Sequence, residues 1–313
     1  MNGLSADEIF NLALFYAGYL YFPAAAILLW MIAAKAGFNR LFAGVILLGL
    51  SVLAYARFIE PRILLTVRHD VKLERCFAKA GKIRLAVISD THQGVFGNEP
   101  PIARIARRIA EEKPDAVLIA GDLTYLLDPA RFEETFAPLS TLDAPVYAVL
   151  GNHDDRFRGK NIAAPLSESL ERDGVHVIDN AAETQVIDGE KIEFAGLSDA
   201  NVARQDLRVV EAPIAYPRIA LVHNPKLVRK LPKHAPIDLL VAGHTHGGQI
   251  YIPWLTCRLV GFACAVTRYG LVDTEAVKLF VTSGTGMVGL PLRFNVPPRI
   301  DVLNVSYTAC GET

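Results

Sequence analysis

The chain is poor in cysteine, tryptophan and methionine, and it carries almost no excess of charge of either sign. Its 313 residues include two tryptophans and three methionines, and 32 basic residues are balanced by 33 acidic ones. This balance argues against a protein built to coat nucleic acid, which needs a basic surface. The sequence also lacks internal repeats and low-complexity tracts, so repeat architectures and disordered linkers are not expected.

The cysteines show no CxxC spacing. There are four of them, at Cys76, Cys257, Cys264 and Cys310. Zinc knuckles and redox motifs of the CxxC type are therefore excluded. Without the dense, regular spacing of a disulfide framework, we expect four reduced and packed thiols.

What the chain has in excess is apolar sequence near its start. Hydrophobic residues make up 51% of it, and the mean hydropathy of +0.27 is high for a purely soluble domain. The run from Ile9 to Ala34 has 26 residues without a charge, whereas roughly 20 suffice to cross a bilayer. A second run, from Leu41 to Ala56, has 16 residues. The turn between them, "KAGFNR", is short and basic.

A signal peptide and a buried soluble hairpin are the alternatives for this region. A signal peptide would begin with basic residues, but this chain opens with Asp7 and Glu8. A soluble hairpin would show a polar and an apolar face, and these runs do not. We therefore expect a two-helix transmembrane anchor over residues 1–60, a basic juxtamembrane connector over 61–81, and one folded domain over 82–313.

From residue 82 the sequence alternates strand-like and helix-like segments. "KIRLAVISD", "DAVLIAGD" and "PVYAVLGNHDD" have the composition of buried strands, and "PIARIARRIAEEK" and "PARFEETFAPLSTL" between them resemble helices. This order predicts βαβ units and a largely parallel α/β fold. Further strands are expected at "RIALVHN", "IDLLVAGHTH", "VKLFVTSG" and "RIDVLNVSY", with a hairpin that turns at Asp188–Gly189.

Polar side chains recur where these strands end. In chain order they are Asp90, His92, Asp122, Asn152, His153, His223, His244 and His246. Any one of them alone would be interpreted as a satisfied polar group at a strand end. Because five strands deliver such residues to the edge where α/β sheets form their sites, we predict a common site.

The residue types at this edge indicate metal binding. Oxygen and imidazole ligands without a thiolate suit Mn²⁺, Fe or Zn²⁺ in a catalytic site. Even seven of these eight residues are too many ligands for one ion that also holds water, and they suit two ions roughly 3.5–4 Å apart that share a carboxylate. In "AGHTHGGQ", His244 and His246 would serve one ion each. The GxGxxG pattern at residues 284–289 is interpreted as a loop at the rim, since Pro291 would break the helix that a nucleotide site needs.

The ordered blocks D-x-H, G-D, G-N-H-D, H and G-H-T-H resemble those of the calcineurin-like metallophosphoesterases. The resemblance covers residues 82–306, and the tail from Val281 to Val305 is similar to the bacterial membrane-linked branch. That branch includes anchored phosphodiesterases and a UDP-diacylglucosamine pyrophosphatase. The resemblance implies a four-layer αββα metallophosphoesterase sandwich, here behind the transmembrane hairpin.

The resemblance also implies roles for the clustered residues. Asp90, His92, Asp122 and His246 would hold one metal; Asp122 would bridge to a second, completed by Asn152, His223 and His244. His153 would stand beside the leaving group. The expected cofactors are two divalent ions, with Mn favoured over Fe or Zn. The two ions would activate a bridging water, as hydroxide, for in-line attack on phosphorus.

The expected function is hydrolysis of a phosphodiester or pyrophosphate bond by a membrane-anchored enzyme. A lipid or lipid-linked substrate such as UDP-diacylglucosamine is favoured, because the anchor keeps the site close to the bilayer. The apolar stretch "IYIPWLTCRLVGFACAV", with Trp254, Phe262, Arg258 and Arg268, is either an interfacial surface or a core strand with a packed loop. The alternatives are a non-catalytic metal-binding scaffold on this fold and a phosphatase for soluble esters.

The location is predicted from basic residues near the two apolar runs. Residues 57–75 contain Arg57, Arg62, Arg68, Lys72 and Arg75, against Lys35 and Arg40 in the turn. The positive-inside rule then places a multi-pass protein in the inner (cytoplasmic) membrane with its catalytic domain on the cytoplasmic side. The oligomeric state is left open.

Overall fold

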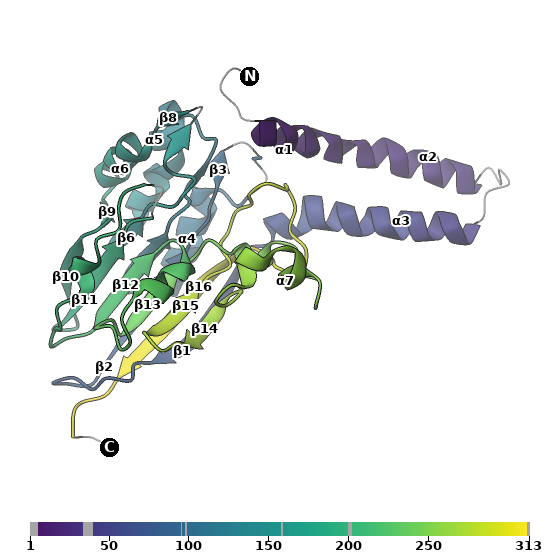
Figure 1. The fold of residues 1–313 in the computed structure, drawn as a ribbon. Helices are drawn as coiled ribbons and strands as arrows, with labels where there is room; N and C mark the ends of the chain where they lie inside the picture. Colours follow the sequence, from purple (N-terminus) through teal and green to yellow (C-terminus); the bar gives the residue numbers. More distant parts are fainter. Residues whose placement is uncertain are drawn as a thin grey trace.

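Two mixed six-stranded sheets pack face to face in the computed structural model (Figure 1). The structure describes residues 6–33, 40–94, 96–97, 99–157, 159–199 and 202–311. The first sheet contains, in spatial order, β1 (Leu65–Lys72), β16 (Arg299–Tyr307), β2 (Gly81–Ile88), β4 (Ala116–Ala120), β6 (Val146–Val149) and β9 (Val175–Val177). The second contains β10 (Ala182–Ile187), β11 (Glu190–Leu197), β12 (Arg218–Val222), β13 (Leu239–Ala242), β15 (Lys278–Val281) and β14 (Gly270–Asp273).

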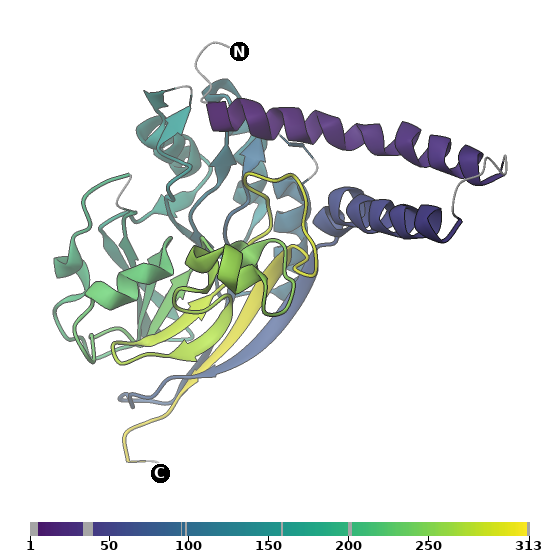
Figure 2. The same ribbon diagram turned by 45° about the vertical axis from the view of Figure 1, so that its right-hand side comes forward.

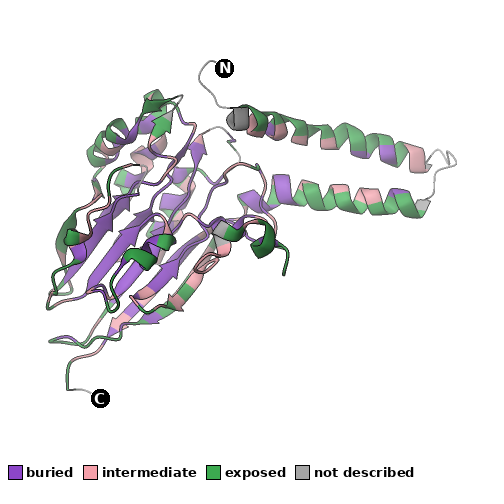
Figure 3. Ribbon diagram, viewed as in Figure 1, coloured by how far each residue is buried: buried purple, intermediate pink, exposed green. Residues whose placement is uncertain are grey.

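The core between the sheets is formed by alternate residues of these strands. Leu85 and Val87 of β2 face Phe194 of β11 and Phe280 of β15 in one buried cluster. The rings of Tyr147 and Phe194 stack across the two sheets with centroids 4.4 Å apart. Because side chains of a strand alternate between its faces, the other residues of β2 and β4 are left for the outer side. Figure 3 shows the central strands as buried, whereas the edge strands β1, β10 and β14 are mostly exposed or intermediate.

Helices cover the outer face of the first sheet, and short 3-10 helices cover that of the second. The α-helical layer consists of α4 (Ile102–Glu112), α5 (Phe132–Phe136) and α6 (Ala163–Arg172). The second sheet is covered by η6 (Leu207–Val210) and η7 (Pro225–Lys230). The predicted α/β class and four-layer αββα arrangement are confirmed. The helix expected over "PARFEETFAPLSTL" is reduced to α5 with 3-10 segments on both sides, and Pro138 is the second residue after it.

The hairpin predicted at Asp188–Gly189 is also confirmed. β10 and β11 are antiparallel, and Ile187 pairs with Glu190 across a two-residue turn. Asp188 and Gly189 have φ values of 51° and 80°. Positive φ angles at both central residues are characteristic of the type I′ turn. This turn is common in two-residue hairpins because its twist matches that of the flanking strands.

Two apolar helical rods project together from one end of the domain (Figures 1 and 2). α1 (Ala6–Ala17) continues through a 3-10 turn into α2 (Tyr21–Ala33), and α3 (Arg40–Ala54) continues to Arg62. Ile9–Ile32 and Leu41–Arg62 are long and apolar enough to cross a membrane. The turn predicted between them lies at residues 35–40, most of which are outside the described residues. The start of α1 and the end of α3 both adjoin the domain.

The stretch predicted as a connector, residues 61–81, contains a strand of the first sheet. β1 pairs in parallel with β16 over its whole length, from Leu65 opposite Arg299 to Lys72 opposite Ser306. Two basic residues of this stretch make ion pairs within the domain: Arg68 of β1 with Glu112, and Arg75 after β1 with Asp238. The boundaries at residues 60 and 81 stay a prediction, and β1 ties this stretch to the domain.

The expectation of four reduced cysteines is wrong. Cys76 is bonded to Cys310, and Cys257 to Cys264. The first pair is 234 residues apart in sequence, yet its Cα atoms are 4.9 Å apart. Cys76 follows β1 and Cys310 follows β16, and because these strands are parallel neighbours they leave the sheet at the same end. Sequence spacing could not show this, since the pairing depends on the register of two distant strands.

Candidate active site

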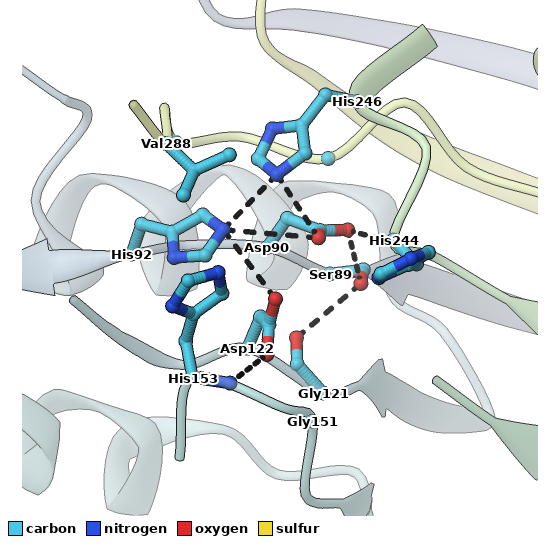
Figure 4. A network of polar contacts seen from close by, with 12 residues as sticks. Ser89, Asp90, His92, Gly121, Asp122, Gly151, His153, His244, His246 and Val288 are labelled. Carbon is cyan, nitrogen blue, oxygen red and sulfur yellow. Dashed lines mark hydrogen bonds and ion pairs between the residues drawn. The ribbon is translucent and has the colours of Figure 1, made fainter. Parts of the chain in front are cut away.

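The predicted strand-end residues come together at one edge shared by both sheets (Figure 4). The first sheet delivers Asp90 and His92 after β2, Asp122 after β4, and Asn152 and His153 after β6. The second delivers His223 after β12, and His244 and His246 after β13. The other three histidines, His69, His176 and His234, lie elsewhere, and His69 and His176 make ion pairs with Asp301 and Glu183.

One group of candidate ligands contains Asp90, His92 and His246, all of them buried. The Nε2 atoms of His92 and His246 are 3.0 Å apart. The Asp90 Oδ1 atom lies 3.3 Å from the His246 Nε2 atom and 3.8 Å from the His92 Nε2 atom. Three donor atoms therefore converge on one point from two sheets.

A second group contains Asp122, His223 and His244. The His223 Nε2 atom lies 3.1 Å from the Asp122 Oδ2 atom and 3.0 Å from the His244 Nδ1 atom. The same Asp122 oxygen is 3.6 Å from the His92 Nε2 atom of the first group. Asp122 thus adjoins both groups, the position that a bridging carboxylate requires.

The protonation equilibria of His92, His246 and Asp122 suit cation binding, whereas His223 carries a proton that a bound ion would displace. Burial holds the pKa of His92 and His246 well below the usual range, which leaves imidazole lone pairs available. Burial alone would raise the pKa of Asp122, but the neighbouring His223, His92 and His153 hold it well below the usual range. Burial opposes protonation of His223, yet the Asp122 carboxylate outweighs it and raises the pKa to about 10.

Three buried polar atoms at this edge have no hydrogen-bond partner. They are the Asp90 Oδ1, Asn152 Oδ1 and His246 Nδ1 atoms. Buried polar atoms are normally paired, so unpaired ones indicate a missing ligand or water. One cation beside Asp90 and a second beside Asn152 would satisfy these two oxygens. The residues present therefore fit a pair of divalent ions.

The backbone at this edge is held in an unusual conformation. Five of the seven candidate ligands have positive φ angles: Asp90 51°, His92 44°, Asp122 54°, His244 70° and His246 51°. The left-handed region costs energy for residues other than glycine, and such residues concentrate at functional sites. Gly243 and Gly151 permit the close approach, since a Cβ atom at Gly243 would overlap the Ser89 hydroxyl and one at Gly151 the Asp122 carboxylate.

His153 stands at the open side of the cluster. Its backbone N–H donates to the Asp122 Oδ1 atom at 2.8 Å. Its ring centroid lies 5.1 Å from that of His92 and 5.2 Å from that of Tyr125. The residue is half-buried, whereas His92 is fully enclosed. An imidazole in this position can meet a substrate that reaches the candidate ions.

Asp154 is a buried support of the site, which the sequence alone did not reveal. None of its surface is exposed. Its carboxylate accepts hydrogen bonds from the backbone N–H groups of Leu123, Thr124 and Gly151 at 3.1, 2.9 and 3.0 Å. Burial, with the nearby Asp122 charge, raises the pKa of Asp154 to about 7. It joins the loops that carry Asp122 and His153.

The glycine pattern at residues 284–289 is a loop against the site, as predicted. The Thr285 and Gly286 backbone N–H groups donate to the Ser89 and Asp90 carbonyls at 3.0 and 2.6 Å. Arg293, fully buried, donates from its guanidinium to carbonyls of Gly286, Ser283 and Val296. No sequence pattern pointed to Arg293, because a lone arginine in a loop is usually solvated.

The stretch from Ile250 to Val266 is a surface segment with a short helix, α7 (Thr256–Leu259), and no strand of either sheet. Trp254 is 86% exposed and Leu259 73% exposed. Of the two interpretations left open, the core strand is therefore wrong. The Phe262 side chain lies outside what the structure describes.

Comparison with known proteins identifies the domain. Residues 83–248 match the family of calcineurin-like phosphoesterases. An uncharacterized metallophosphoesterase of Bacillus subtilis, YkuE, is 29% identical over 280 residues, which cover 88% of this chain and 96% of the relative. The phosphodiesterase YaeI of Escherichia coli is 29% identical over 262 residues, 80% of this chain and 92% of the relative.

A third relative carries a membrane-spanning part. A Danio rerio protein described as a transmembrane protein with a metallophosphoesterase domain is 27% identical over 253 residues, 75% of this chain and 55% of that relative. With two apolar helices here, membrane association is indicated. The family is dimetal-dependent, and the two groups of ligands described above are candidate sites for its ions. This chain belongs to the calcineurin-like metallophosphoesterases, which are metal-dependent hydrolases of phosphoesters.

Proposed function

We propose that the protein is a membrane-anchored dimetal phosphoesterase that hydrolyses a phosphodiester or pyrophosphate bond of a lipid or lipid-linked substrate. The observation that carries this proposal is the pair of adjacent ligand groups, joined by Asp122, with His153 at their open side. A chain that kept only the fold would not need to bury so many unpaired ligand atoms.

The ligand assignment is part of this proposal. One ion would be held by Asp90, His92, Asp122 and His246, and the other by Asp122, Asn152, His223 and His244. When bound, such ions supply a water nucleophile near neutral pH and charge that stabilises phosphoryl oxygens. The geometry that supports this is the convergence of each group on one point and the contact of Asp122 with both. Mn is the favoured metal, with Fe or Zn as alternatives.

His153 is proposed to act on the leaving group. Its backbone is fixed by Asp122, and its ring lies against His92 and Tyr125, so the imidazole is positioned without being enclosed. From there it can donate a proton to the departing oxygen or stabilise its charge. Positioned acid–base groups of this kind contribute about 10²–10⁴-fold to a rate.

The test is a hydrolysis screen on the full chain in lipid nanodiscs, loaded with Mn²⁺. The substrates are a phosphomonoester, a soluble phosphodiester, a diacyl phospholipid and a nucleotide–lipid pyrophosphate such as UDP-diacylglucosamine. We expect hydrolysis of a diester or pyrophosphate, and a loss of about 10²–10⁴-fold in His153→Ala with metal content unchanged. His176→Ala is the matched control, because His176 is partly exposed and pairs with Glu183 away from the site. A metal-loaded protein that hydrolyses none of these substrates would instead be a non-catalytic scaffold.

We infer that the catalytic domain lies on the oxidising, extracytoplasmic face of the membrane. This is the opposite of the prediction made from basic residues. Both cysteine pairs are disulfide-bonded, and disulfides persist in oxidising compartments. The count of basic residues is weakened, because Arg68 and Arg75 belong to the folded domain and are paired there with Glu112 and Asp238.

The remaining basic residues are nearly balanced between the two sides. The segment between the two apolar runs contains Lys35 and Arg40, and the domain side keeps Arg57, Arg62 and Lys72. Because these counts are nearly equal, the orientation proposed here rests on the disulfides. A UDP-linked lipid would then have to be present on the outer side, so the side of the domain also discriminates among substrates.

Protease treatment of intact spheroplasts tests the orientation. We expect the domain to be digested from outside while a cytoplasmic marker survives, and the thiols to be alkylated only after reduction. Protection of the domain in intact cells, with four freely alkylated thiols, would establish the cytoplasmic side.

A further inference from the structure

An apolar cavity lies where the two helical rods meet the domain. Its volume is about 360 Å³, within the range of small-molecule sites. It is formed by both rods and by a loop of the catalytic domain, and its lining includes Leu14, Ala17, Leu53, Phe58, Leu290 and Leu292. The rods therefore enclose a space together with the domain, instead of only tethering it.

The loop that lines this cavity also lines the active site. Val288 points toward His92 and His246 (Figure 4), and Leu290 faces the cavity. The Gln249 Nε2 group donates to the carbonyls of Val288 and Leu290 at 3.0 and 2.7 Å, which holds this segment in place. Val288 and Leu290 are two residues apart in sequence, and two residues of extended chain span at most about 7 Å. The cavity therefore begins close to the candidate ligands.

The first helix forms a second connection between the cavity and the site. Phe15 of α1 stacks on Phe96 with ring centroids 5.5 Å apart, and Phe96 lies 5.5 Å from Tyr125. The Tyr125 ring in turn lies 5.2 Å from that of His153, and the Asn11 amide donates to the Tyr125 hydroxyl at 3.3 Å. Contacts thus run without a break from the proposed catalytic imidazole to a helix of the anchor.

A cationic side chain stands at the domain end of the cavity. Arg57 is the charged residue in a lining that is otherwise apolar, apart from the Tyr21 hydroxyl. Its guanidinium lies 4.3 Å from the centroid of the Phe15 ring. Gly18 makes this approach possible, since a Cβ atom there would lie 3.2 Å from the Arg57 Nε atom. A cation at one end and hydrocarbon beyond it complement an amphiphile with an anionic head.

We propose that this cavity binds an acyl chain of the substrate lipid while the phosphoester lies at the candidate metal site. The inference rests on the proposed function and identifies the substrate as a lipid whose chain enters between α1–α2 and α3. The anchor helices are then part of the binding site. The other possible occupant is a lipid of the surrounding membrane. In that case the cavity would not affect which substrate is hydrolysed.

Filling the cavity tests the proposal. Ala54→Phe places a ring in it from α3, and Val52→Phe on the same helix, outside the lining, is the matched control. Each full-length variant is reconstituted in nanodiscs with Mn²⁺ and assayed on phospholipids with one headgroup and either hexanoyl or palmitoyl chains. We expect Ala54→Phe to raise KM for the palmitoyl lipid at least about tenfold with little change in kcat, and to leave the hexanoyl lipid unaffected. Val52→Phe should change neither.

Photolabelling reports directly whether a lipid chain occupies the cavity. A diacyl phosphatidic acid with a diazirine in one chain is photolysed in the same nanodiscs, and labelled residues are located by mass spectrometry. We expect labels at the cavity residues of α1 and α3 in the wild type and their loss in Ala54→Phe. Labels spread evenly over the outer faces of α3, or equal kinetic losses on both chain lengths, would overturn the proposal. If no lipid is hydrolysed but the cavity is labelled, the proposed function fails and the binding site remains.

Discussion

The two sheets make different chemical contributions to one site. The first sheet supplies every candidate oxygen ligand, from Asp90, Asp122 and Asn152, whereas the second supplies only candidate imidazole ligands, from His223, His244 and His246. Each candidate ligand group combines members of both sheets. Neither sheet alone can hold an ion in this way, so the interface between them determines the metal site as much as the ligands do.

The core between the two sheets contributes no candidate ligand to the site. It is an apolar cluster that includes Leu85, Tyr147, Phe194 and Phe280, and it ends where the ligands begin. The outer faces of the sheets have separate apolar clusters under helices and 3-10 turns. Changes in the inter-sheet core should therefore affect metal binding, and equal changes in an outer core should affect stability alone.

The largest expected effect comes from the residue that joins the two groups. Removing the ions with a chelator should abolish hydrolysis, and Asp122→Ala should lower the content of both ions, because Asp122 adjoins His92 and His223. Metal analysis together with activity on a soluble diester measures this. His246→Ala, which touches one group, should mainly lower the content of one ion. Full activity in a metal-free preparation would disprove the mechanism.

A pair of variants compares the core between the sheets with the outer core under the helices. Phe194→Ala in the inter-sheet core and Phe136→Ala in the outer core should each cost about 3–5 kcal/mol of stability, since both side chains are fully buried. The thermal midpoint should fall by about 10 °C in each case. Only Phe194→Ala should also weaken metal affinity, by about 10–100-fold, as loss of support around a metal site does.

Calorimetric titration of Mn²⁺ at a temperature where both variants remain folded distinguishes them. Equal weakening of metal affinity in Phe194→Ala and Phe136→Ala would mean that global stability, not sheet packing, governs the site.

Asp154→Asn probes how the first sheet holds its loops. In the native protein the Asp154 carboxylate accepts hydrogen bonds from backbone N–H groups. The amide of asparagine keeps one acceptor oxygen, but its NH₂ group would face backbone N–H donors and could not accept from them. We expect activity to fall about 10–100-fold through displacement of His153 and its loop, with the protein still folded. Asp155→Asn, at the more exposed neighbouring residue, is the control. Unchanged kinetics in Asp154→Asn would show that the buried carboxylate supports the fold but not the site.

The smallest effect is expected at the exposed apolar surface of the second sheet's long loop. Trp254→Ala removes a side chain that is 86% exposed, so stability should change by no more than about 0.5 kcal/mol. Turnover of a soluble ester should stay the same, while turnover of a lipid in vesicles should fall a few-fold if this surface dips into the interface. Equal losses on both substrates would assign Trp254 to the fold.

Much of the fold and the candidate site follows from local sequence patterns. The strand-like runs before Asp90, Asp122 and His153 are buried strands, because uninterrupted apolar residues can be accommodated only in the interior of a sheet. Strand ends of parallel units share one edge, so the polar residues after them could be assigned to one site before any distance was known. The apolar runs at the start likewise reveal two helices by length alone.

The tertiary structure decided what depends on segments that are distant in sequence. The disulfide between Cys76 and Cys310 arises from the register of β1 against β16, and the burial of Asp154 from loops of two different strands. The contact of Phe15 with the aromatic residues around His153 likewise joins α1 to the site. Sequence periodicity reports which face of an element is apolar, but it does not report which other element covers that face. The partners are chosen by packing of the whole chain, and for this protein that packing brings the candidate ligands together across two sheets and places an apolar helix, α1, at the edge of the site.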